Sequence, residues 1–263
     1  MNRKPITVNP AEFPSIFSSL LTGAPVSDSS CSPQARVYYI DRDGGYFLKR
    51  SPGGTLKKEA SMAAYFHEKS LGPPVLSYIT DEGTGEDWLL TARLPGEDGI
   101  FPGHLSDPAR LCDLLSESLT MLHSLPTDGC PVPNRTAEYL RCAEEGYHTG
   151  RFDLSYGWPS PFPSAEDAWR TLSEGRHLLG TDTLIHGDYC LPNILFRDGK
   201  LSGFIDVGNG GIGDRHVDLY WGVWTLIYNL KTNRYTDRFL DGYGRSRVST
   251  DMLRIVSAAE VFG

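Results

Sequence analysis

The chain has 263 residues, of which 40% are hydrophobic and 22% are charged, the composition of an ordinary soluble globular protein. Its net charge of −8 argues against a nucleic-acid partner, because such a surface needs clustered Lys and Arg. The five scattered cysteines indicate reduced thiols, and without a signal peptide or an 18-residue apolar run we expect a cytoplasmic protein with no membrane partner.

The first third of the chain is predicted to be β-rich, because aromatic and β-branched runs alternate with turn segments. Residues 41–45 contain Asp and Gly between two such runs and therefore predict a hairpin. Thr55 is expected to cap a helix that continues to about His67. The strands are expected at residues 37–40, 46–49, 75–79 and 88–92.

The rest of the chain is predicted to be mainly helical. The Pro/Gly segment 94–99, which precedes this helical part, is interpreted as a hinge between a lobe of residues 1–93 and a lobe of residues 100–263. Residues 150–163 contain three prolines and are interpreted as a surface loop, with a lid or binding loop as the alternative. The helices are expected at residues 106–122, 167–179, 217–230 and 250–262.

The most informative segment places a carboxylate, an amide and a second carboxylate at Asp188, Asn193 and Asp206. The turn Asp198-Gly199 predicts a hairpin whose two ends would bring the last two of these together. One aspartate can orient a substrate hydroxyl, while the amide and the other carboxylate can hold a hard cation through oxygen. We therefore predict phosphoryl transfer from a magnesium nucleotide to a small molecule. The alternative is that the three polar residues merely cap turns.

The glycine-rich run 208–213 has the spacing of a dinucleotide-binding loop and is a second candidate for chemistry. A dinucleotide fold would also need a second parallel strand, whereas Tyr220, Trp221 and Trp224 indicate an aromatic helix instead. The glycines are therefore interpreted as a loop whose backbone passes close to a ligand.

These motifs resemble those of a known family. His-Gly-Asp-x-x-x-x-Asn at 186–193 and Ile-Asp-x-Gly at 205–208 are similar to the signature of the aminoglycoside phosphotransferases, above all the branch that phosphorylates the 3′-hydroxyl. The resemblance runs from Ser32 to Phe262. It implies an α+β, two-lobed protein-kinase-like fold with a small β-rich amino-terminal lobe and a larger, mainly helical carboxy-terminal lobe. It also implies an enzyme that moves the γ-phosphoryl group of ATP or GTP to an aminoglycoside and so confers antibiotic resistance.

The resemblance assigns roles in phosphoryl transfer. Asp188 would be the catalytic aspartate facing the substrate hydroxyl, and Asn193 and Asp206 would ligate Mg²⁺. Lys49 would contact the α- and β-phosphates and pair with Glu59 on the following helix. Without the downstream motif, Lys49 and Glu59 would be interpreted as an exposed strand-end cation and a solvated helix carboxylate.

The resemblance also implies how the nucleotide is held. Ser32, in a short loop that replaces the glycine-rich loop of protein kinases, would touch the phosphates. Adenine would stack on Phe47, which is otherwise an ordinary core residue. Backbone groups near Ala92 and Leu94 would bind the adenine edge.

At the acceptor, the chain departs from the family pattern. The family usually has Arg in the loop after the metal aspartate, where this chain has Asn209. It also tends to have an Asp-Glu pair before terminal aromatics, which binds ammonium groups, and here only the Glu remains. The candidate substrate residues are Asp153, Asn209, Glu260 and Phe262, with Glu144 or Glu145 as further replacements for the missing Asp.

Two other functions stay open. The same chemistry could act on another small alcohol, such as a macrolide, choline, homoserine or a sugar amine. A nucleotide-binding pseudokinase is disfavoured, because the residues for transfer are all present. Whichever of these functions applies, we expect the protein to be a monomer.

We also expect constitutive activity without phosphorylation. Gly187 stands where protein kinases carry the Arg that can read a phosphorylated loop. Only eleven residues separate Asp206 from Asp218, too few for a long activation segment. His186 and Asp218 are assigned to scaffolding around the catalytic loop.

Overall fold

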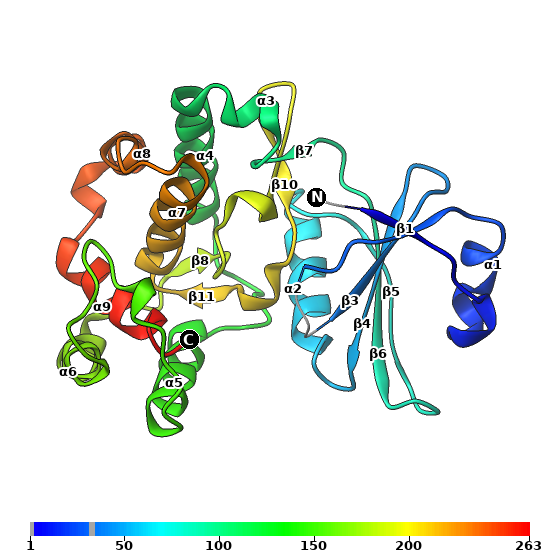
Figure 1. The fold of residues 1–263 in the computed structure, drawn as a ribbon, viewed down its shortest axis with the longest axis horizontal. Helices are drawn as coiled ribbons and strands as arrows, with labels where there is room; N and C mark the ends of the chain where they lie inside the picture. The colour runs from blue at the N-terminus through cyan, green and yellow to red at the C-terminus, as the bar shows by residue number, and fades with distance from the viewer. Residues whose placement is uncertain (1–2, 32–34) are drawn as a thin grey trace. The chain divides into compact units, whose positions relative to one another are not determined.

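The computed structural model describes residues 3–31 and 35–263 and divides the chain into two units (Figure 1). Unit 1 contains Met1–Asp98, Ile194–Asp198 and Ser202–Gly208, and unit 2 contains Gly99–Asn193, Gly199–Leu201 and Asn209–Gly263. No helix in the described part of the chain is long and apolar enough to cross a membrane. Because a hairpin from the second half of the sequence belongs largely to unit 1, the two units are not simply consecutive pieces of chain.

Unit 1 is built on an antiparallel sheet with the strand order β1-β2-β3-β4-β6-β5. The predicted strands and the hairpin at 41–45 are confirmed, and two short strands that were not predicted extend the sheet at one edge. The strands are β1 Lys4–Ile6, β2 Val26–Asp28, β3 Arg36–Ile40, β4 Tyr46–Pro52, β5 Val75–Asp81 and β6 Glu86–Ala92.

Both faces of this sheet are covered, as Figure 1 shows. On one face, Phe17 from the 3₁₀ turn Ser15–Phe17 and Leu21 from α1 (Ser18–Leu21) pack with Trp88, and all three side chains are at most 1% exposed. On the other face, Leu56 and Ala60 at the start of α2 (Lys57–Glu68) pack on the sheet. Successive side chains of a strand point to opposite faces, so β4 can contribute side chains to both layers.

Helix α2 begins differently from the prediction that Thr55 caps it. The Thr55 hydroxyl donates to Ser51 Oγ and to Pro52 O, so it does not cap the helix. The amide of Leu56, the residue before the helix, instead donates to Asp87 Oδ2 at 2.9 Å. Local sequence suggested a nearby cap, whereas a carboxylate 31 residues away fixes the start of α2.

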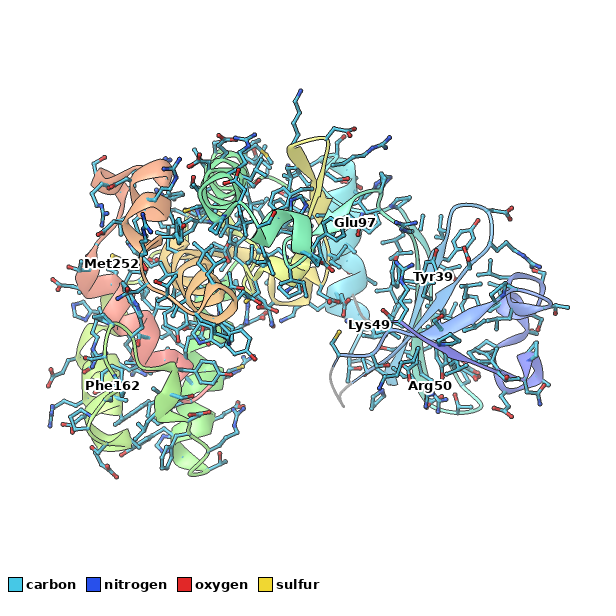
Figure 2. The ribbon with its side chains drawn as sticks, turned by 45° about the horizontal axis from the view of Figure 1, so that its top comes forward. Tyr39, Lys49, Arg50, Glu97, Phe162 and Met252 are labelled. Atoms are coloured by element: carbon cyan, nitrogen blue, oxygen red, sulfur yellow. The ribbon has the colours of Figure 1, made fainter. Side chains whose placement is uncertain are left out.

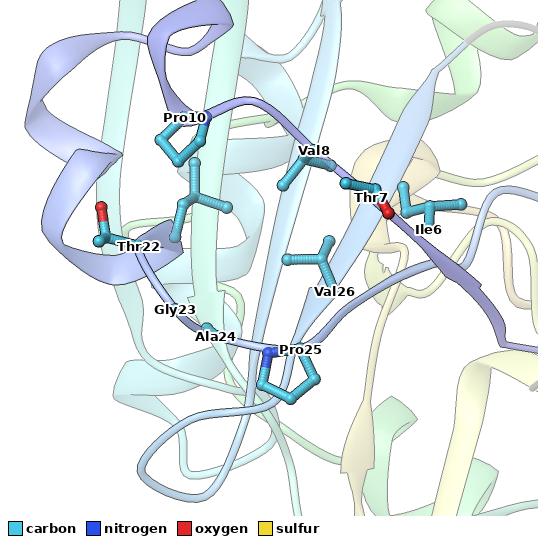
Figure 3. Close-up of a pocket in the computed structure, with 10 residues that line it drawn as sticks. Ile6, Thr7, Val8, Pro10, Thr22, Gly23, Ala24, Pro25 and Val26 are labelled. Carbon is cyan, nitrogen blue, oxygen red and sulfur yellow. The ribbon is translucent and has the colours of Figure 1, made fainter.

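A hollow of about 450 Å³ lies in unit 1 beside β1 and β2 (Figure 3). Its lining consists of residues between Ile6 and Val26, mostly apolar. None of the predicted site residues lines it, so this hollow has no part in the chemistry considered below.

The hairpin predicted at Asp198-Gly199 is confirmed. Strands β9 (Ile194–Arg197) and β10 (Lys200–Phe204) lie side by side in a sheet with β7 (Glu97–Asp98). Asp198 and Gly199 both have positive φ, 52° and 72°, as a two-residue hairpin turn requires. Phe204 N donates to Leu71 O at 2.7 Å, which fastens the end of β10 to unit 1 just before Asp206.

Unit 2 is mainly helical around a two-stranded pair, β8 (Thr183–Ile185) with β11 (Gly211–Gly213). The predicted helices correspond to α4, α6, α7 and α9, whereas α3, α5 and α8 were not predicted. Helix α6 ends earlier than the predicted residue 179, because residues 176–178 tighten into a 3₁₀ turn. The helices are α3 Pro102–Leu105, α4 Pro108–His123, α5 Arg135–His148, α6 Ala165–Gly175, α7 Arg215–Leu230, α8 Thr236–Tyr243 and α9 Thr250–Glu260.

Asp87 gives a test of how α2 is positioned. Asp87 is 0% exposed, and its carboxylate accepts hydrogen bonds from Leu56 N, Tyr78 Oη and Thr80 Oγ1. Burial raises the pKa of Asp87, but these hydrogen bonds, together with a larger contribution from the Gly54 backbone, outweigh it and hold the pKa below the ordinary value of 3.8. We expect Asp87→Ala to lower the free energy of unfolding at pH 7 by about 3 kcal/mol, because buried donors lose their acceptor.

Urea unfolding measures this change, with the exposed Glu82→Ala as the matched control. Because the native carboxylate has a lowered pKa, its contribution is complete above pH 4 and declines as the pH falls below that value. A difference between wild type and Asp87→Ala that does not shrink in acid would contradict this role.

Candidate active site

In unit 1, a lysine lies between two carboxylates. Lys49 on β4, labelled in Figure 2, places Nζ 2.8 Å from both carboxylate oxygens of Glu59 on α2. The same Nζ is 3.0 Å from Asp206 Oδ1, after β10. The side chains of Lys49 and Glu59 are only 20% and 15% exposed, whereas that of Asp206 is 53% exposed. The predicted pair of Lys49 and Glu59 is therefore present, and the structure adds Asp206 to it.

The ionisation states of Lys49, Glu59 and Asp206 depend on one another. Burial alone would lower the pKa of Lys49, but the charges of Asp206 and Glu59 raise it well above the ordinary value, so Lys49 is a cation. Burial raises the pKa of Glu59, and Lys49 opposes that rise. Lys49 is thus held by a partner on α2 while its ammonium group reaches the exposed carboxylate of Asp206.

The backbone of Asp206 is in the left-handed region, with φ at 56°. A non-glycine residue there stores strain, and such residues concentrate at functional sites. Two residues later, a Cβ on Gly208 would lie 3.3 Å from Glu59 Cβ, so the loop after Asp206 passes close to α2. The neighbour that Gly208 approaches is Glu59, whereas the sequence interpretation that these glycines let the loop pass close to a ligand stays a prediction.

In unit 2, the predicted catalytic loop has its aspartate and asparagine in contact. Asn193 Nδ2 donates to Asp188 Oδ2 at 2.9 Å and to the Asp188 carbonyl at 3.1 Å. Asp188 is partly exposed, and its own amide hydrogen-bonds to His186 Nδ1 at 3.2 Å. One carboxylate oxygen of Asp188 is therefore oriented by Asn193, while the side chain stays accessible.

A buried carboxylate behind the loop fixes its backbone. Asp218, which is 0% exposed, accepts at 2.7 Å from both His186 N and Gly187 N. His123 Nε2 lies 3.0 Å from Asp218 Oδ2, and His123 Nδ1 lies 2.9 Å from Tyr243 Oη. Burial lowers the pKa of His123. Asp218 thus has the scaffolding role predicted for it.

Gly187 is required by a close approach. A Cβ at this position would lie 1.9 Å from Asn209 O, and the φ of Gly187 is 79°. Arg135 Nε donates to the same Asn209 carbonyl at 2.7 Å, and Arg135 Nη2 lies 3.4 Å from Asn209 Oδ1. The Asn209 side chain, a predicted substrate residue, therefore faces the nearly buried Arg135. The position that carries Arg in protein kinases has no room for a side chain here.

The residues expected to hold the nucleotide lie in unit 1, apart from Ser32, which falls outside the described residues. Phe47 is two residues before Lys49 on β4, so both side chains point to the same face of the sheet. The Phe47 ring is half-buried, 5.3 Å from that of Tyr39. Ala92 ends β6, and Leu94 follows it.

Three of the candidate acceptor residues, Asp153, Glu260 and Phe262, lie at the end of α9. Glu260 is 9% exposed and its Oε1 accepts from Tyr139 Oη at 2.9 Å and Trp221 Nε1 at 3.0 Å. Asp153 is exposed, and its amide donates to Val261 O at 2.8 Å, which brings it beside the same turn. Phe262, also predicted to contact substrate, is 1% exposed and is a core residue instead.

The ionisation of Glu260 is set by its surroundings. Burial raises its pKa to about 7, while the hydrogen bonds from Tyr139 and Trp221 act in the opposite direction and the charge of Asp188 raises it further. A cation beside this carboxylate would favour its ionised form. Glu144 and Glu145 instead form surface ion pairs with Arg176 and Arg141.

The two predicted magnesium ligands lie in different units, Asn193 in unit 2 and Asp206 in unit 1. Within residues 3–31 and 35–263, no group of three or more His, Cys, Asp or Glu side chains could hold a metal ion. Asn193 Oδ1 and Asp206 Oδ2 accept no hydrogen bond from the residues in these ranges. Mg²⁺ is bound by oxygen ligands together with water and phosphate, so the available oxygen of each residue, taken by itself, is of a kind that fits it.

Sequence reasoning did not single out His123, Tyr243 or Arg135. Each acts on a partner far along the chain, for example 95 residues from His123 to Asp218 and 74 from Arg135 to Asn209. No local pattern marks them, because His123 is the last residue of an amphipathic helix and Arg135 the first of another. Their contacts become evident only in the tertiary structure, where the helices pack together.

Comparison with known proteins finds a family model and relatives that match most of the chain. The model of the phosphotransferase enzyme family matches residues 32–254. A probable aminoglycoside 3′-phosphotransferase of Lactococcus lactis subsp. lactis is 41% identical over 262 residues, covering 100% of this chain and 99% of that protein.

Two solved structures share the fold. The crystal structure of an aminoglycoside-3′-phosphotransferase of type VIII aligns with a TM-score of 0.70 at 24% identity, covering 96% of each chain. The aminoglycoside phosphotransferase APH(3″)-Id from Streptomyces rimosus, in complex with ADP and streptomycin, aligns with a TM-score of 0.66 at 20% identity and covers 87% of this chain and 91% of that one. The predicted α+β, protein-kinase-like fold is thereby confirmed.

The close approach at Gly187 can be tested by a matched pair of substitutions. Gly187→Ala would place Cβ against Asn209 O, and we expect it to lower the free energy of unfolding by about 3 kcal/mol or more. Gly199→Ala has nearly the same φ, 72°, with nothing within 4 Å of the added Cβ, and should lose only about 1 kcal/mol.

Urea unfolding of both variants measures these losses. Because both positions have a positive φ, the difference between the two losses reports the clash with Asn209 alone. Equal losses for Gly187→Ala and Gly199→Ala would show that Asn209 does not lie against the catalytic loop.

Proposed function

The chain belongs to the phosphotransferase enzyme family, and from this premise we propose that it moves the γ-phosphoryl group of ATP or GTP to the 3′-hydroxyl of an aminoglycoside antibiotic. Such a reaction would confer resistance to the drug. The observation that carries the proposal is the cation of Lys49, held by Glu59 with its ammonium group at the Asp206 carboxylate. Phosphoryl transfer depends mainly on positioning and charge, which such a fixed cation supplies.

On the nucleotide side, each residue has a physical task. Lys49 would bind the α- and β-phosphates, and Glu59 would keep its ammonium group in place when the phosphates are absent. Asn193 and Asp206 would hold Mg²⁺ through the oxygens that make no hydrogen bond among the described residues. Mg²⁺, when bound, neutralises the charge of the phosphates. We assign the adenine contacts to Phe47 and to the backbone near Ala92 and Leu94, and a phosphate contact to Ser32.

On the acceptor side, Asp188 would accept a hydrogen bond from the attacking hydroxyl and orient its oxygen toward the γ-phosphorus. Asn193 keeps the carboxylate in one orientation, and Asp218 keeps the loop backbone fixed. Glu260 and Asp153 would pair with ammonium groups of the aminoglycoside, which the name of the 41% identical relative supports as substrate. Together these residues bind and orient the alcohol, and Asp188 takes up its proton.

We place the reaction in the cytoplasm, in a monomer with a hinge at 94–99. All five cysteines are free thiols, as is usual in a reducing compartment. The first passage of the chain from unit 1 to unit 2 falls between Asp98 and Gly99, inside that segment. A kinase for another small alcohol remains the alternative that the assay below distinguishes.

The first test is nucleotide turnover with Mg²⁺, ATP or GTP, and a panel of aminoglycosides. We expect drug-dependent turnover in the wild type. Asp188→Asn should lower kcat at least about 100-fold, because it removes the acceptor of the hydroxyl proton. Asp198→Asn, at the exposed turn of the β9–β10 hairpin, is the matched control and should retain full activity.

Product analysis by NMR would locate the phosphate on the drug. Turnover that no aminoglycoside stimulates, but that another small alcohol does, would replace the proposed acceptor while retaining the reaction type.

A second test uses the pH dependence of acceptor binding. The pKa of Glu260 is raised to about 7, so the carboxylate that would attract an ammonium group is lost as the pH falls below that value. We expect kcat/KM for the aminoglycoside to fall about tenfold per pH unit below pH 7. In Glu260→Gln this step should be absent, because no charge is left to titrate.

Glu144→Gln removes an exposed carboxylate from α5 and serves as the control, since its profile should match the wild type. If the fall of kcat/KM below pH 7 persists unchanged in Glu260→Gln, another group is responsible for it.

A further inference from the structure

Four aromatic side chains lie in a row along one side of helix α7. Trp221, Trp224 and Tyr228 are spaced by three and four residues, so they share a helix face. Tyr156 joins them from the 3₁₀ turn Leu154–Tyr156, with its ring 6.0 Å from that of Trp224. Trp224 and Tyr228 stack at 4.8 Å, and Trp221 meets Trp224 edge-on at 5.3 Å. We call Tyr156, Trp221, Trp224 and Tyr228 the aromatic row.

The side chains of the row are partly accessible to solvent. Tyr228 is 56% exposed, and the other three side chains are only partly buried. Aromatic surface left partly open commonly marks a place where a ligand or partner packs.

The loop that supplies Tyr156 is fixed in place. The Tyr156 carbonyl accepts from Tyr220 Oη on α7 and from Ser257 Oγ on α9 at 3.3 Å. Ser257 Oγ also accepts from Trp158 N at 2.6 Å. The irregular segment 150–163 is therefore hydrogen-bonded to two helices, and Tyr156 is held beside the other three rings of the row.

One end of the row meets the candidate acceptor carboxylate. Trp221 Nε1 donates to Glu260 Oε1 at 3.0 Å, so the indole both belongs to the row and orients Glu260. The second oxygen, Oε2, accepts no hydrogen bond from residues 3–31 or 35–263, although Glu260 is only 9% exposed. The exposed carboxylate of Asp153 lies beside the same turn, because its amide donates to Val261 O at 2.8 Å, so the acidic groups near the row are at this end.

The opposite end already carries a cation. Lys231 Nζ lies 4.2 Å from the centroid of the Tyr228 ring, a cation–π geometry. A positively charged ligand is therefore expected at the Tyr156 and Trp221 end, where the carboxylate has an oxygen without a partner.

We propose that the aromatic row is the apolar wall of the acceptor site, and that it packs against the C–H groups of one amino-sugar ring whose ammonium group pairs with Glu260 Oε2. A saturated amino sugar offers both parts of this match, because its ring carbons are apolar and its amines are cationic. Aromatic rings attract both kinds of group. This inference rests on the proposed aminoglycoside acceptor and adds residues that set which acceptors bind.

The test is calorimetric titration of kanamycin into the full-length protein at pH 8, where Glu260 is ionised. We expect Trp224→Leu to weaken binding about five- to tenfold and Tyr228→Leu about threefold, since each removes aromatic surface from the row. Trp224→Phe should recover most of the affinity, because it restores an aromatic face. Phe101→Leu removes an aromatic side chain that is 43% exposed and lies outside the row, and should bind as the wild type does.

Steady-state kinetics on the same variants separate a wall from a structural support. A wall predicts a higher KM for the aminoglycoside in Trp224→Leu, with kcat and the KM for nucleotide unchanged. Equal kanamycin affinity in wild type, Trp224→Leu and Tyr228→Leu would overturn the inference, as would no kanamycin binding by the wild type. Binding that depends on Trp224 without any turnover would support the wall and overturn the proposed reaction instead.

Discussion

The buried carboxylate of Asp218 is the interaction on which the catalytic loop depends. It accepts from His186 N and Gly187 N at 2.7 Å and from His123, so its charge is compensated without any contact to solvent. A buried charge with its partners removed is strongly destabilising, whereas one with several donors holds them rigidly. The backbone just before Asp188 is thereby fixed, and the direction of the Asp188 side chain follows from it.

Much of the fold could be predicted from the sequence, because its signals were local. Turn residues between β-branched runs gave the hairpins of β3–β4 and β9–β10, and helical spacing of leucines gave α4. The start of α2 was wrong for the opposite reason, since Asp87 reaches it from another strand. Helix α5 was missed although Asn134 caps it, because its apolar face is narrow and becomes evident only in its packing with α9.

The site divides in the same way. The motif identified Asp188, Asn193 and Asp206, and a resemblance supplied Lys49 and Glu59, whose ion pair is present in unit 1. The residues that hold these in place were not predictable, because Arg135 and His123 meet their partners only through tertiary structure. Phe262 shows the reverse error, since its position beside Glu260 in the sequence suggested a ligand contact, yet its ring packs with Tyr147 and Trp169.

The role proposed for Glu260 implies a preference for amines over neutral alcohols. Burial and the nearby charge of Asp188 raise its pKa to about 7, so the ionised form is disfavoured by its own surroundings. A neutral alcohol would leave that penalty uncompensated. An ammonium group beside Oε2 relieves it, so the same burial that weakens the carboxylate strengthens its preference for a cation. In the proposed site, discrimination would then come from desolvation of one carboxylate rather than from the number of acidic residues.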